Sequence, residues 1–226
     1  MESCTTSDAA TEIFILLHGL CRTPRSMAPL EKHLSARGYQ VRNIAYPSRH
    51  LPIHRLSEDY LVPVVQKCAT PEITRIHFVT HSMGGILVRD YFAHHDALKP
   101  GRVVMLGPPN QGSEVVDALR TLGLFHKLNG PAGSELGTGP DSTPNRLGPV
   151  RFPLGIIAGD RSINWINSGL MIRGANDGKV SVERTKIGGM TDHVVVHATH
   201  PLLMRNRNVM AQVVAFLKTG SFSAPR

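Results

Sequence analysis

The chain has 226 residues, of which 41% are hydrophobic and 19% are charged. These proportions exclude a disordered protein and fit one globular domain with a sizeable core of its own. The 25 Lys and Arg against 17 Asp and Glu give a formal net charge of +8, but the basic residues are scattered and only 5% of residues are aromatic. We therefore expect a solvated basic surface and no nucleic-acid partner.

Neither a membrane span nor a signal peptide is predicted. No apolar run approaches the roughly 20 residues that cross a bilayer, although contact with a lipid surface is compatible with the sequence. The amino end, MESCTTSDAATE, lacks the basic and apolar regions of a signal peptide. Cys4, Cys21 and Cys68 have no metal-ligand spacing and cannot all pair, which suits a reducing compartment. The expectation is a cytoplasmic protein.

Six short apolar or β-rich runs along the chain predict strands. They cover residues 13–17, 40–46, 75–80, 102–106, 154–158 and 193–198. Several are apolar nearly throughout, which is typical of parallel strands that are buried on both faces. Because helical patterns alternate with these runs, the sequence predicts an α/β protein whose mostly parallel sheet carries helices on both faces.

Four helical patterns occupy the connections between and after these runs. They cover residues 26–38, 55–68, 83–94 and 208–220. Ser26 is the predicted N-cap of the first helix and Gly38 its end. Pro63 should kink the second helix. The last pattern has an apolar stripe and ends at Gly220.

One segment interrupts the alternation of strands and helices. Residues 130–149 hold five glycines and four prolines without periodicity, and the helix-like residues 113–128 precede them. The composition predicts a long loop, and loops of this length are usually functional or mobile. We expect a single domain over residues 1–226 with a lid-like insert near 108–150.

The stretch FVTHSMGGILVRDY, residues 78–91, places Ser82 at a bend between a strand and a helix. A serine hydroxyl becomes a nucleophile when a base takes its proton, and a third group must orient that base. The strand–turn–helix context fits a nucleophile elbow, and Gly84 is as small as the tight turn requires. Thr80 departs from the G-x-S-x-G form, in which glycine stands at this position. Without catalytic partners, Ser82 would be interpreted as a helix cap.

The first predicted strand ends in His18-Gly19-Leu20. In a sheet of this topology the loop after that strand supplies one oxyanion donor, and the residue after the nucleophile supplies the other. We therefore assign these roles to the backbone N–H groups of Leu20 and Met83. His18 is predicted to be structural and to brace the loop through hydrogen bonds.

Two aspartates and three histidines compete for the remaining roles. Asp160 directly follows the fifth predicted strand, whereas Asp177 lies in an Asn-Asp-Gly turn closer to the histidines, and we favour Asp177 as the acid. His193 opens the last strand and should lie at the far edge of the sheet. His197 is predicted to lie within the strand and pack beside a helix. His200 follows the strand and is the predicted base.

Five segments occur in an order that resembles a known family. They are LLHGL, VTHSMGGILVRDY, GPPNQGSEVVD, GANDGKVSVERT, and His200 with the final helix. Together they resemble the α/β-hydrolase superfamily, and within it the compact bacterial lipases and carboxylesterases without a large cap domain, from about residue 13 to residue 218. The resemblance implies the α/β-hydrolase fold and the following roles: Ser82 as nucleophile, His200 as base, Asp177 as acid, and Leu20 and Met83 at the oxyanion hole.

The predicted function is hydrolysis of carboxylic esters by a serine hydrolase, with a small-molecule or lipid ester as substrate. No metal and no organic cofactor is expected, and the chain has no G-x-G-x-x-G fingerprint. Thioester hydrolysis or acyl transfer is an alternative, because the same residues do not choose the acyl acceptor. A non-catalytic binding protein of the same fold is a second alternative. The sequence makes no prediction of an oligomeric state.

Overall fold

A computed structural model describes residues 11–96, 98–119, 123–162, 172 and 174–223. Six strands form one sheet in the order β2-β1-β3-β4-β5-β6, and every neighbouring pair is parallel. The strands are β1 Thr11–Leu17, β2 Gln40–Ile44, β3 Ile73–His81, β4 Pro100–Leu106, β5 Leu154–Gly159 and β6 Asp192–Val196. The predicted α/β class with a parallel sheet is confirmed.

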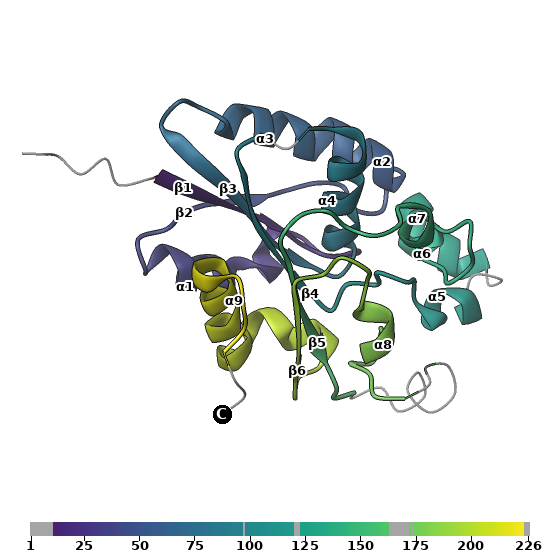
Figure 1. The fold of residues 1–226 in the computed structure, drawn as a ribbon. Coiled ribbons are helices and arrows are strands. Elements are labelled where there is room, and N and C mark those ends of the chain that lie inside the picture. Colours follow the sequence, from purple (N-terminus) through teal and green to yellow (C-terminus); the bar gives the residue numbers. More distant parts are fainter. Residues whose placement is uncertain (1–10, 97, 120–122, 163–171, 173, 224–226) are drawn as a thin grey trace, which may run out of the picture.

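Helices cover both faces of the sheet. The α-helices are α1 Ala28–Ser35, α2 Ile53–Leu56, α3 Val62–Cys68, α4 Met83–His94, α5 Glu114–Leu119, α6 Gly123–Ser134, α7 Thr143–Arg146, α8 Val182–Thr185 and α9 Arg207–Thr219. Helices α2, α3 and α4 lie along one face, and α1 and α9 along the other (Figure 1). Two 3-10 helices, Pro24–Ser26 and His200–Arg205, precede α1 and α9 respectively.

The first helix begins later than the sequence predicts. Ser26 is not its N-cap, because the Ser26 hydroxyl donates a hydrogen bond to the carbonyl oxygen of Thr23 within a 3-10 turn, and α1 starts at Ala28. Pro24 favours this turn, since a proline has no N–H to place in the first turn of a helix. Gly38 adopts a φ of 84° just beyond α1, so the predicted end of this helical region is confirmed.

The last helix follows its prediction closely. Asn206 caps α9, its side chain accepting hydrogen bonds from the amides of Asn208 and Val209. The apolar stripe of α9 is buried against the sheet, and Gly220 ends the helix with a φ of 84°. Favourable residues at both ends and a regular stripe make such a helix predictable from local sequence.

The predicted kink near Pro63 takes the form of a wide turn. Residues Ser57–Leu61 form a π-helical segment between α2 and α3, and Pro63 lies in the first turn of α3. A proline cannot donate the hydrogen bond of a continuous α-helix, and its ring crowds the carbonyl four residues earlier. The π-helical turn interrupts the ladder at this point, which accommodates the proline.

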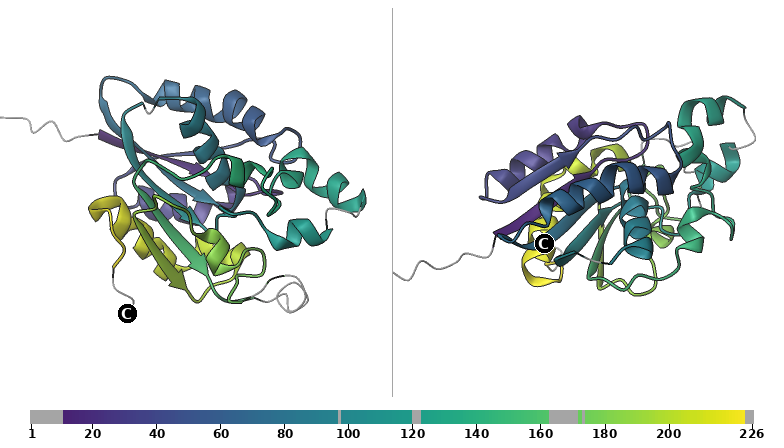
Figure 2. Two further views of the ribbon diagram at one scale, coloured as in Figure 1. Left: turned by 45° about the vertical axis from the view of Figure 1, so that its right-hand side comes forward. Right: turned by 90° about the horizontal axis from the view of Figure 1, so that it is seen from above.

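The segment predicted as a long loop, residues 130–149, is partly helical. Helix α6, with a kink at Gly130, extends to Ser134, and α7 follows at Thr143–Arg146. Helices α5, α6 and α7 gather at the end of the sheet where the strands terminate (Figure 2). Short helices of one or two turns have too few residues to produce a visible period, which is why composition alone suggested a loop.

A buried arginine joins α7 to the body of the domain. Arg89 of α4 donates hydrogen bonds to the carbonyl oxygens of Asn110, Pro144 and Gly148, at 3.0, 2.7 and 2.8 Å. Burial lowers the pKa of Arg89 to about 10, so the guanidinium stays protonated at neutral pH. The chain around α7 is thus attached to α4 by charge-assisted hydrogen bonds.

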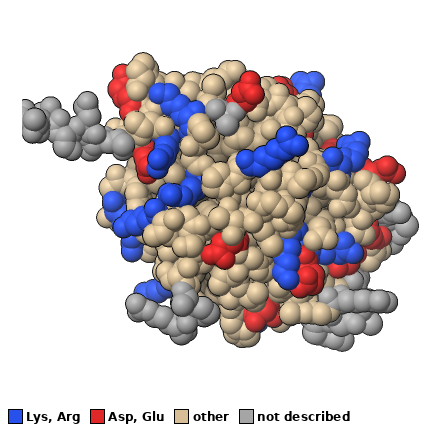
Figure 3. All heavy atoms as spheres, in the orientation of Figure 1, with Lys and Arg blue, Asp and Glu red and all other residues tan. Residues whose placement is uncertain are grey.

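The charged side chains on the face seen in Figure 3 form several separate groups, with acidic residues between the basic ones. No continuous basic band crosses this face. Across the residues that the structure describes, no helix combines the length and the apolar character that a membrane crossing requires.

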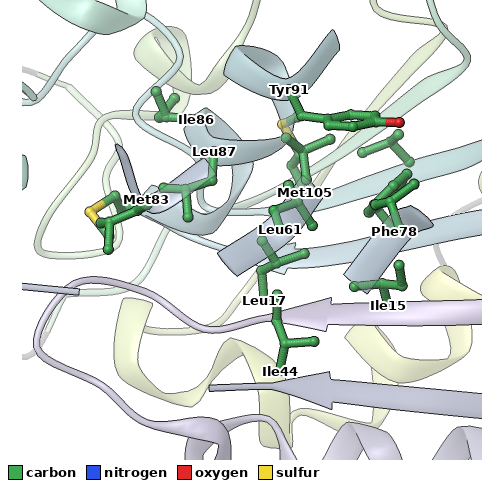
Figure 4. Close-up of a cluster of buried hydrophobic side chains, with 14 of the residues drawn as sticks. Ile15, Leu17, Ile44, Leu61, Phe78, Met83, Ile86, Leu87, Tyr91 and Met105 are labelled. Atoms are coloured by element: carbon green, nitrogen blue, oxygen red, sulfur yellow. The ribbon is translucent and has the colours of Figure 1, made fainter. Parts of the chain in front are cut away.

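The core beneath α4 holds the elements near Ser82 in place. Phe78, Met83, Leu87 and Met105 contribute to one buried cluster between the sheet and this helix (Figure 4). Alternate residues of β1 point to opposite faces, so Ile13, Ile15 and Leu17 join this cluster while Phe14 and Leu16 join the cluster beneath α1 and α9. Burial on both faces explains the uninterrupted apolar run of β1.

Candidate active site

Ser82 lies at the bend between β3 and α4 in a strained backbone conformation. Its φ is 53° and its ψ is −126°, a region that a residue with a side chain rarely adopts and that costs about 1–3 kcal/mol. The surrounding structure maintains this conformation, since the amide of Ser82 donates a 2.9 Å hydrogen bond to the carbonyl oxygen of Leu106. The bend raises the hydroxyl above the ends of the strands.

Two glycines make the bend sterically feasible. A Cβ atom at Gly84 would come within 2.8 Å of the carbonyl oxygens of Leu17 and His18, and one at Gly19 would lie 3.0 Å from the Cβ of Ser82. The contacts at Gly84 are closer than Cβ atoms come in proteins, and the contact at Gly19 is so tight that Ser82 would have to shift. The first turn of α4 can therefore pack against the end of β1 only where residue 84 is glycine, as the motif predicts.

His200 and Asp177 form a buried pair beside this bend. His200 Nδ1 lies 2.7 Å from Asp177 Oδ2, and the two residues are 8% and 2% exposed. The amide of His200 also donates to the carbonyl oxygen of Asp177 at 3.0 Å. With Nδ1 directed at the carboxylate, Nε2 of the imidazole is the nitrogen that remains for another partner.

The backbone fixes the carboxylate of Asp177 from the other side. Its Oδ1 accepts hydrogen bonds from the amides of Lys179 and Val180 at 3.0 and 2.9 Å. Glycines allow the strand ends to approach the pair: a Cβ at Gly107 would lie 2.9 Å from Asp177 Oδ2, and one at Gly159 would lie 2.9 Å from the Cβ of Asp177. The Asn-Asp-Gly turn thus holds an orienting carboxylate ready for the imidazole.

Asp160 and His197 form a separate pair at the surface. His197 Nδ1 lies 2.9 Å from Asp160 Oδ1, and the two side chains are 73% and 35% exposed. The prediction that His197 lies within the last strand beside a helix is wrong, because β6 ends at Val196. His193 lies near the start of β6, as predicted, and its Nε2 is 3.0 Å from the hydroxyl of Thr185. The side chains of Asp160, His193 and His197 do not line the cavity that contains Ser82.

Ser82 and His200 line one cavity of about 280 Å3, which we call the Ser82 pocket. Its apolar wall comes from five side chains: Leu20, Val115, Val116, Leu136 and Val180. Residues of the segment between β4 and β5 thus form part of the wall, together with residues that follow β1, β3 and β5. Ligands of open α/β sheets bind at this edge, beyond the carboxyl ends of the strands.

The two amides predicted to bind an oxyanion are those of Leu20 and Met83. Within the described part of the chain, neither amide donates a hydrogen bond to another residue. Leu20 lines the Ser82 pocket, and Met83 begins α4 directly after Ser82. The unpaired N–H group of Met83 lies at the start of α4, a position suited to an anion.

His18 braces the loop that follows β1. It is fully buried, its Nδ1 lies 2.9 Å from the carbonyl oxygen of Gly19, and its ring stacks on Tyr46 with 4.0 Å between the ring centroids. The hydroxyl of Tyr46 donates a hydrogen bond to the carbonyl oxygen of His18. Burial lowers the pKa of His18, so the ring is neutral at physiological pH. This agrees with the structural role predicted for it.

His81 is a residue of the site that the sequence analysis overlooked. Its Nε2 lies 3.0 Å from the carbonyl oxygen of His200, and the two rings are 4.7 Å apart. Burial, followed by the charge of His200, holds the pKa of His81 well below its usual range. A neutral His81 with its proton on Nε2 donates to that carbonyl, and so helps to position His200. The HSMGG motif contained this histidine, but no local pattern indicates its distant partner.

Histidine pairs with the spacing of metal ligands also occur in the sequence. The sequence contains three His-x-x-x-His pairs, which the prediction of no bound metal did not take into account. They are His50 and His54, His77 and His81, and His193 and His197. The second pair lies on β3 and the third begins on β6, and four residues of strand span about 13 Å, too far to share one ion.

Among the described residues, one cluster has the composition and spacing of a metal site. His54 Nδ1 lies 3.1 Å from Asp90 Oδ2, and His94 Nδ1 lies 3.6 Å from Asp90 Oδ1. The cluster lines a different cavity and shares no residue with the Ser82 pocket. His54 forms a hydrogen bond with the Asp90 carboxylate, whereas His94 Nδ1 forms its hydrogen bond with the backbone carbonyl oxygen of Asp90, at 2.9 Å. These hydrogen bonds account for the cluster, and we assign no ion to it.

Comparison with known proteins gives matches among solved structures only. No family model and no curated protein matches the sequence. The mature form of lipase BlEst2 from Bacillus licheniformis is similar, with a TM-score of 0.72 and 18% identity over 94% of this chain and 93% of the lipase. Phospholipase PlaB from Legionella pneumophila gives 0.73 and 14% over 94% and 60% of the two chains. The metagenomic carboxyl esterase MGS0156 gives 0.68 and 19% over 86% and 66%.

At these identities the likeness shows the fold, and the protein has the α/β-hydrolase fold. Several of the structural neighbours are named lipases or esterases, and another is an extracellular α/β-hydrolase from a Paenibacillus species. The predicted resemblance is thereby confirmed. The chain spans nearly all of mature BlEst2, but only 50% of its propeptide form and 60% of PlaB.

Proposed function

We propose that the protein is a serine hydrolase that cleaves carboxylic esters. The observation that carries the proposal is the shared Ser82 pocket: a strained serine and a histidine line it, and that histidine is bound to a buried aspartate. Lipases and carboxyl esterases among the structural neighbours support the same type of reaction.

The reaction would proceed through an acyl-enzyme. Oγ of Ser82 attacks the ester carbonyl while Nε2 of His200 takes its proton, and Asp177 stabilises the resulting imidazolium through Nδ1. The amides of Leu20 and Met83 bind the oxyanion, and such a donor typically contributes about 3 kcal/mol to transition-state stabilisation. His200 then protonates the leaving alcohol. Water, activated by the same imidazole, hydrolyses the acyl-enzyme and regenerates Ser82.

The test is hydrolysis of p-nitrophenyl esters of increasing acyl length by wild-type protein and by Ser82→Ala. We expect turnover by the wild type and background rates for the variant, which lacks the nucleophile. Circular dichroism would establish that the variant is folded. If the folded wild type hydrolyses none of these esters, or if Ser82→Ala hydrolyses them equally well, the proposal is wrong.

Asp177 and Asp160 offer a matched comparison for the acid. Asp177→Asn should lower kcat by a factor on the order of 10⁴, because an amide does not stabilise the imidazolium and favours the wrong tautomer. Asp160→Asn should retain activity, since its partner is the exposed His197. Loss of activity in Asp160→Asn alone would overturn the assignment of Asp177.

A further inference from the structure

A second cavity adjoins the Ser82 pocket. Its volume is about 430 Å3, and it shares Cys21 and Arg22 with the Ser82 pocket. We call it the cationic groove, because Arg22, Arg25 and Arg205 line it. The loop after β1 therefore separates two cavities of different character, one with an apolar wall and one with three guanidinium groups.

Positive charge also surrounds the mouth of the Ser82 pocket. Lys179 lines this pocket together with Arg22. Burial raises the pKa of the Cys21 thiol, whereas the charges of Arg49, Lys179 and Arg22 lower it, which shows that three cations act at this point. Among the described residues that line either cavity there is no carboxylate to neutralise them.

The placement of charge relative to Ser82 favours a particular kind of ester. An ester extends in two directions from its carbonyl carbon, with the acyl chain on one side and the alcohol on the other. The apolar wall of Leu20, Val116 and Leu136 suits the acyl chain. The cationic groove suits an anionic group on the alcohol, and planar guanidinium groups bind phosphate oxygens in a bidentate manner.

We propose that the substrate is an acyl ester whose alcohol carries a phosphate group. This inference rests on the proposed serine-hydrolase function and adds the class of the leaving alcohol. The reaction consumes one water, breaks the bond between the acyl carbon and the alcohol oxygen, and releases a carboxylic acid and the phosphate-bearing alcohol. No bond to phosphorus changes, and the groove only binds the phosphate.

Both a soluble phosphate ester and a membrane phospholipid have this chemistry. Leu202 lines the cationic groove and is 49% exposed, so an apolar side chain stands next to the guanidinium groups. Such an arrangement is compatible with either source. The test therefore presents a phosphate ester both as a dispersed monomer and in a membrane.

The test compares octanoyl-glycerol-3-phosphate with octanoylglycerol, both as dispersed monomers. We expect kcat/KM to be about tenfold higher for the phosphate ester, which corresponds to one well-placed ionic contact. The preference should decrease as ionic strength rises, because exposed cations are screened by salt. A second arm presents phosphatidic acid or diacylglycerol in phosphatidylcholine vesicles. A phosphate preference in vesicles alone identifies a lipid source, and one among monomers identifies a free phosphate ester.

Arginine variants link the preference to the groove. The double variant Arg25→Gln, Arg205→Gln, at two arginines that line the groove but not the Ser82 pocket, should reduce the preference to about one, while turnover of octanoylglycerol stays near the wild-type rate. Arg37→Gln is the matched control, since Arg37 is exposed on the surface near the end of α1 and its guanidinium bonds the carbonyl oxygen of His33. All three arginines are exposed, so these variants should fold.

The two proposals fail in different ways. If octanoylglycerol is hydrolysed in a Ser82-dependent manner but neither arm shows a phosphate preference, the substrate class is wrong and the serine-hydrolase function stands. A preference that survives in the double variant also overturns the assignment of the groove. If the folded protein hydrolyses the p-nitrophenyl esters but neither octanoyl ester, the substrate class alone is wrong. If it hydrolyses none of these esters, the proposed function fails and the substrate class fails with it.

Discussion

Thr80 shows how a single residue can depart from a motif without disrupting the site. It is fully buried in β3, two positions before Ser82, where the G-x-S-x-G form has glycine. A Cβ at Gly85 would lie 3.2 Å from the Thr80 hydroxyl oxygen and 2.9 Å from the sulfur of Met105. The branched side chain is accommodated because residue 85 has no side chain of its own.

The Thr80 hydroxyl has no hydrogen-bond partner among the described residues, and an unpaired buried hydroxyl is unfavourable. Thr80→Val keeps the shape of the side chain and removes the hydroxyl. It should raise the free energy of unfolding by about 1 kcal/mol, measured by urea denaturation, with ester hydrolysis unchanged.

Thr185→Val is the matched control for this substitution. Thr185 is equally buried, but its hydroxyl donates to the carbonyl oxygen of Val182 and lies 3.0 Å from His193 Nε2. Its replacement should lower the free energy of unfolding by about 1–3 kcal/mol, because the partners lose their hydrogen bonds. Equal losses in the two variants would contradict the interpretation of Thr80.

The histidines near the carboxyl end show that residue type alone does not determine where a side chain lies. His193, His197 and His200 lie within eight residues of one another in the sequence. Counting positions along the strand correctly places His193 near its start and His200 beyond its end, because strand geometry is regular. His197 was misplaced, since the strand ends one residue before it and the carboxylate of Asp160 binds its ring at the surface.

At the scale of elements, the connection of α7 to α4 is the feature that composition concealed. Glycine and proline in residues 130–149 suggested a structureless loop, yet Arg89 binds one carbonyl oxygen within α7, that of Pro144, and one just after it, that of Gly148. Arginine within an apolar helix such as α4 does not reveal its partners, which lie more than fifty residues further along the chain.

Arg89→Met should therefore destabilise the protein and loosen the chain around α7. The variant leaves three buried carbonyl oxygens without their donor, and breaking a buried charged network of this kind costs about 3–5 kcal/mol. Urea denaturation should show this loss, and limited proteolysis should cut between residues 130 and 149 faster than in the wild type.

Arg55→Met provides the comparison. Arg55 is exposed, and its guanidinium pairs with Asp59 one turn away, so the substitution should change the free energy of unfolding by less than about 1 kcal/mol. If Arg89→Met proves no more destabilising than Arg55→Met, Arg89 does not hold α7 to the domain.

At the scale of the whole molecule, buried histidines couple folding to pH. His81 is 1% exposed and has its pKa held well below the usual range by burial and then by the charge of His200. The unfolded chain binds this proton below about pH 6.5, whereas the folded protein does not. Stability from this residue is therefore present at neutral pH and decreases as the pH falls below about 6.5.

His81→Asn should flatten this dependence. Between pH 6.5 and pH 5 the wild type should lose up to about 2 kcal/mol of unfolding free energy through protonation of His81 in the unfolded chain. The variant lacks this contribution, because asparagine does not titrate. Urea denaturation at several pH values measures the difference between the two profiles. His50→Asn, at an exposed position, is the control and should keep the wild-type profile. Parallel profiles for wild type and His81→Asn would contradict the prediction.

The sequence by itself determined the parallel sheet, the extents of α4 and α9, and the bend at Ser82. These features depend on neighbouring residues, through apolar runs, caps and the small residues of a tight turn, so local physics is sufficient to predict them. The likeness to solved structures with the α/β-hydrolase fold agrees with that prediction.

Only the tertiary structure decided which distant side chains meet. The hydrogen bond from His200 goes to Asp177 because Gly107 and Gly159 let the strand ends approach that carboxylate, while Asp160 points to the surface. Likewise, the gathering of Arg22, Arg25 and Arg205 around one groove joins segments nearly two hundred residues apart. Contacts of this kind follow from the packing of the whole chain, which no local pattern encodes.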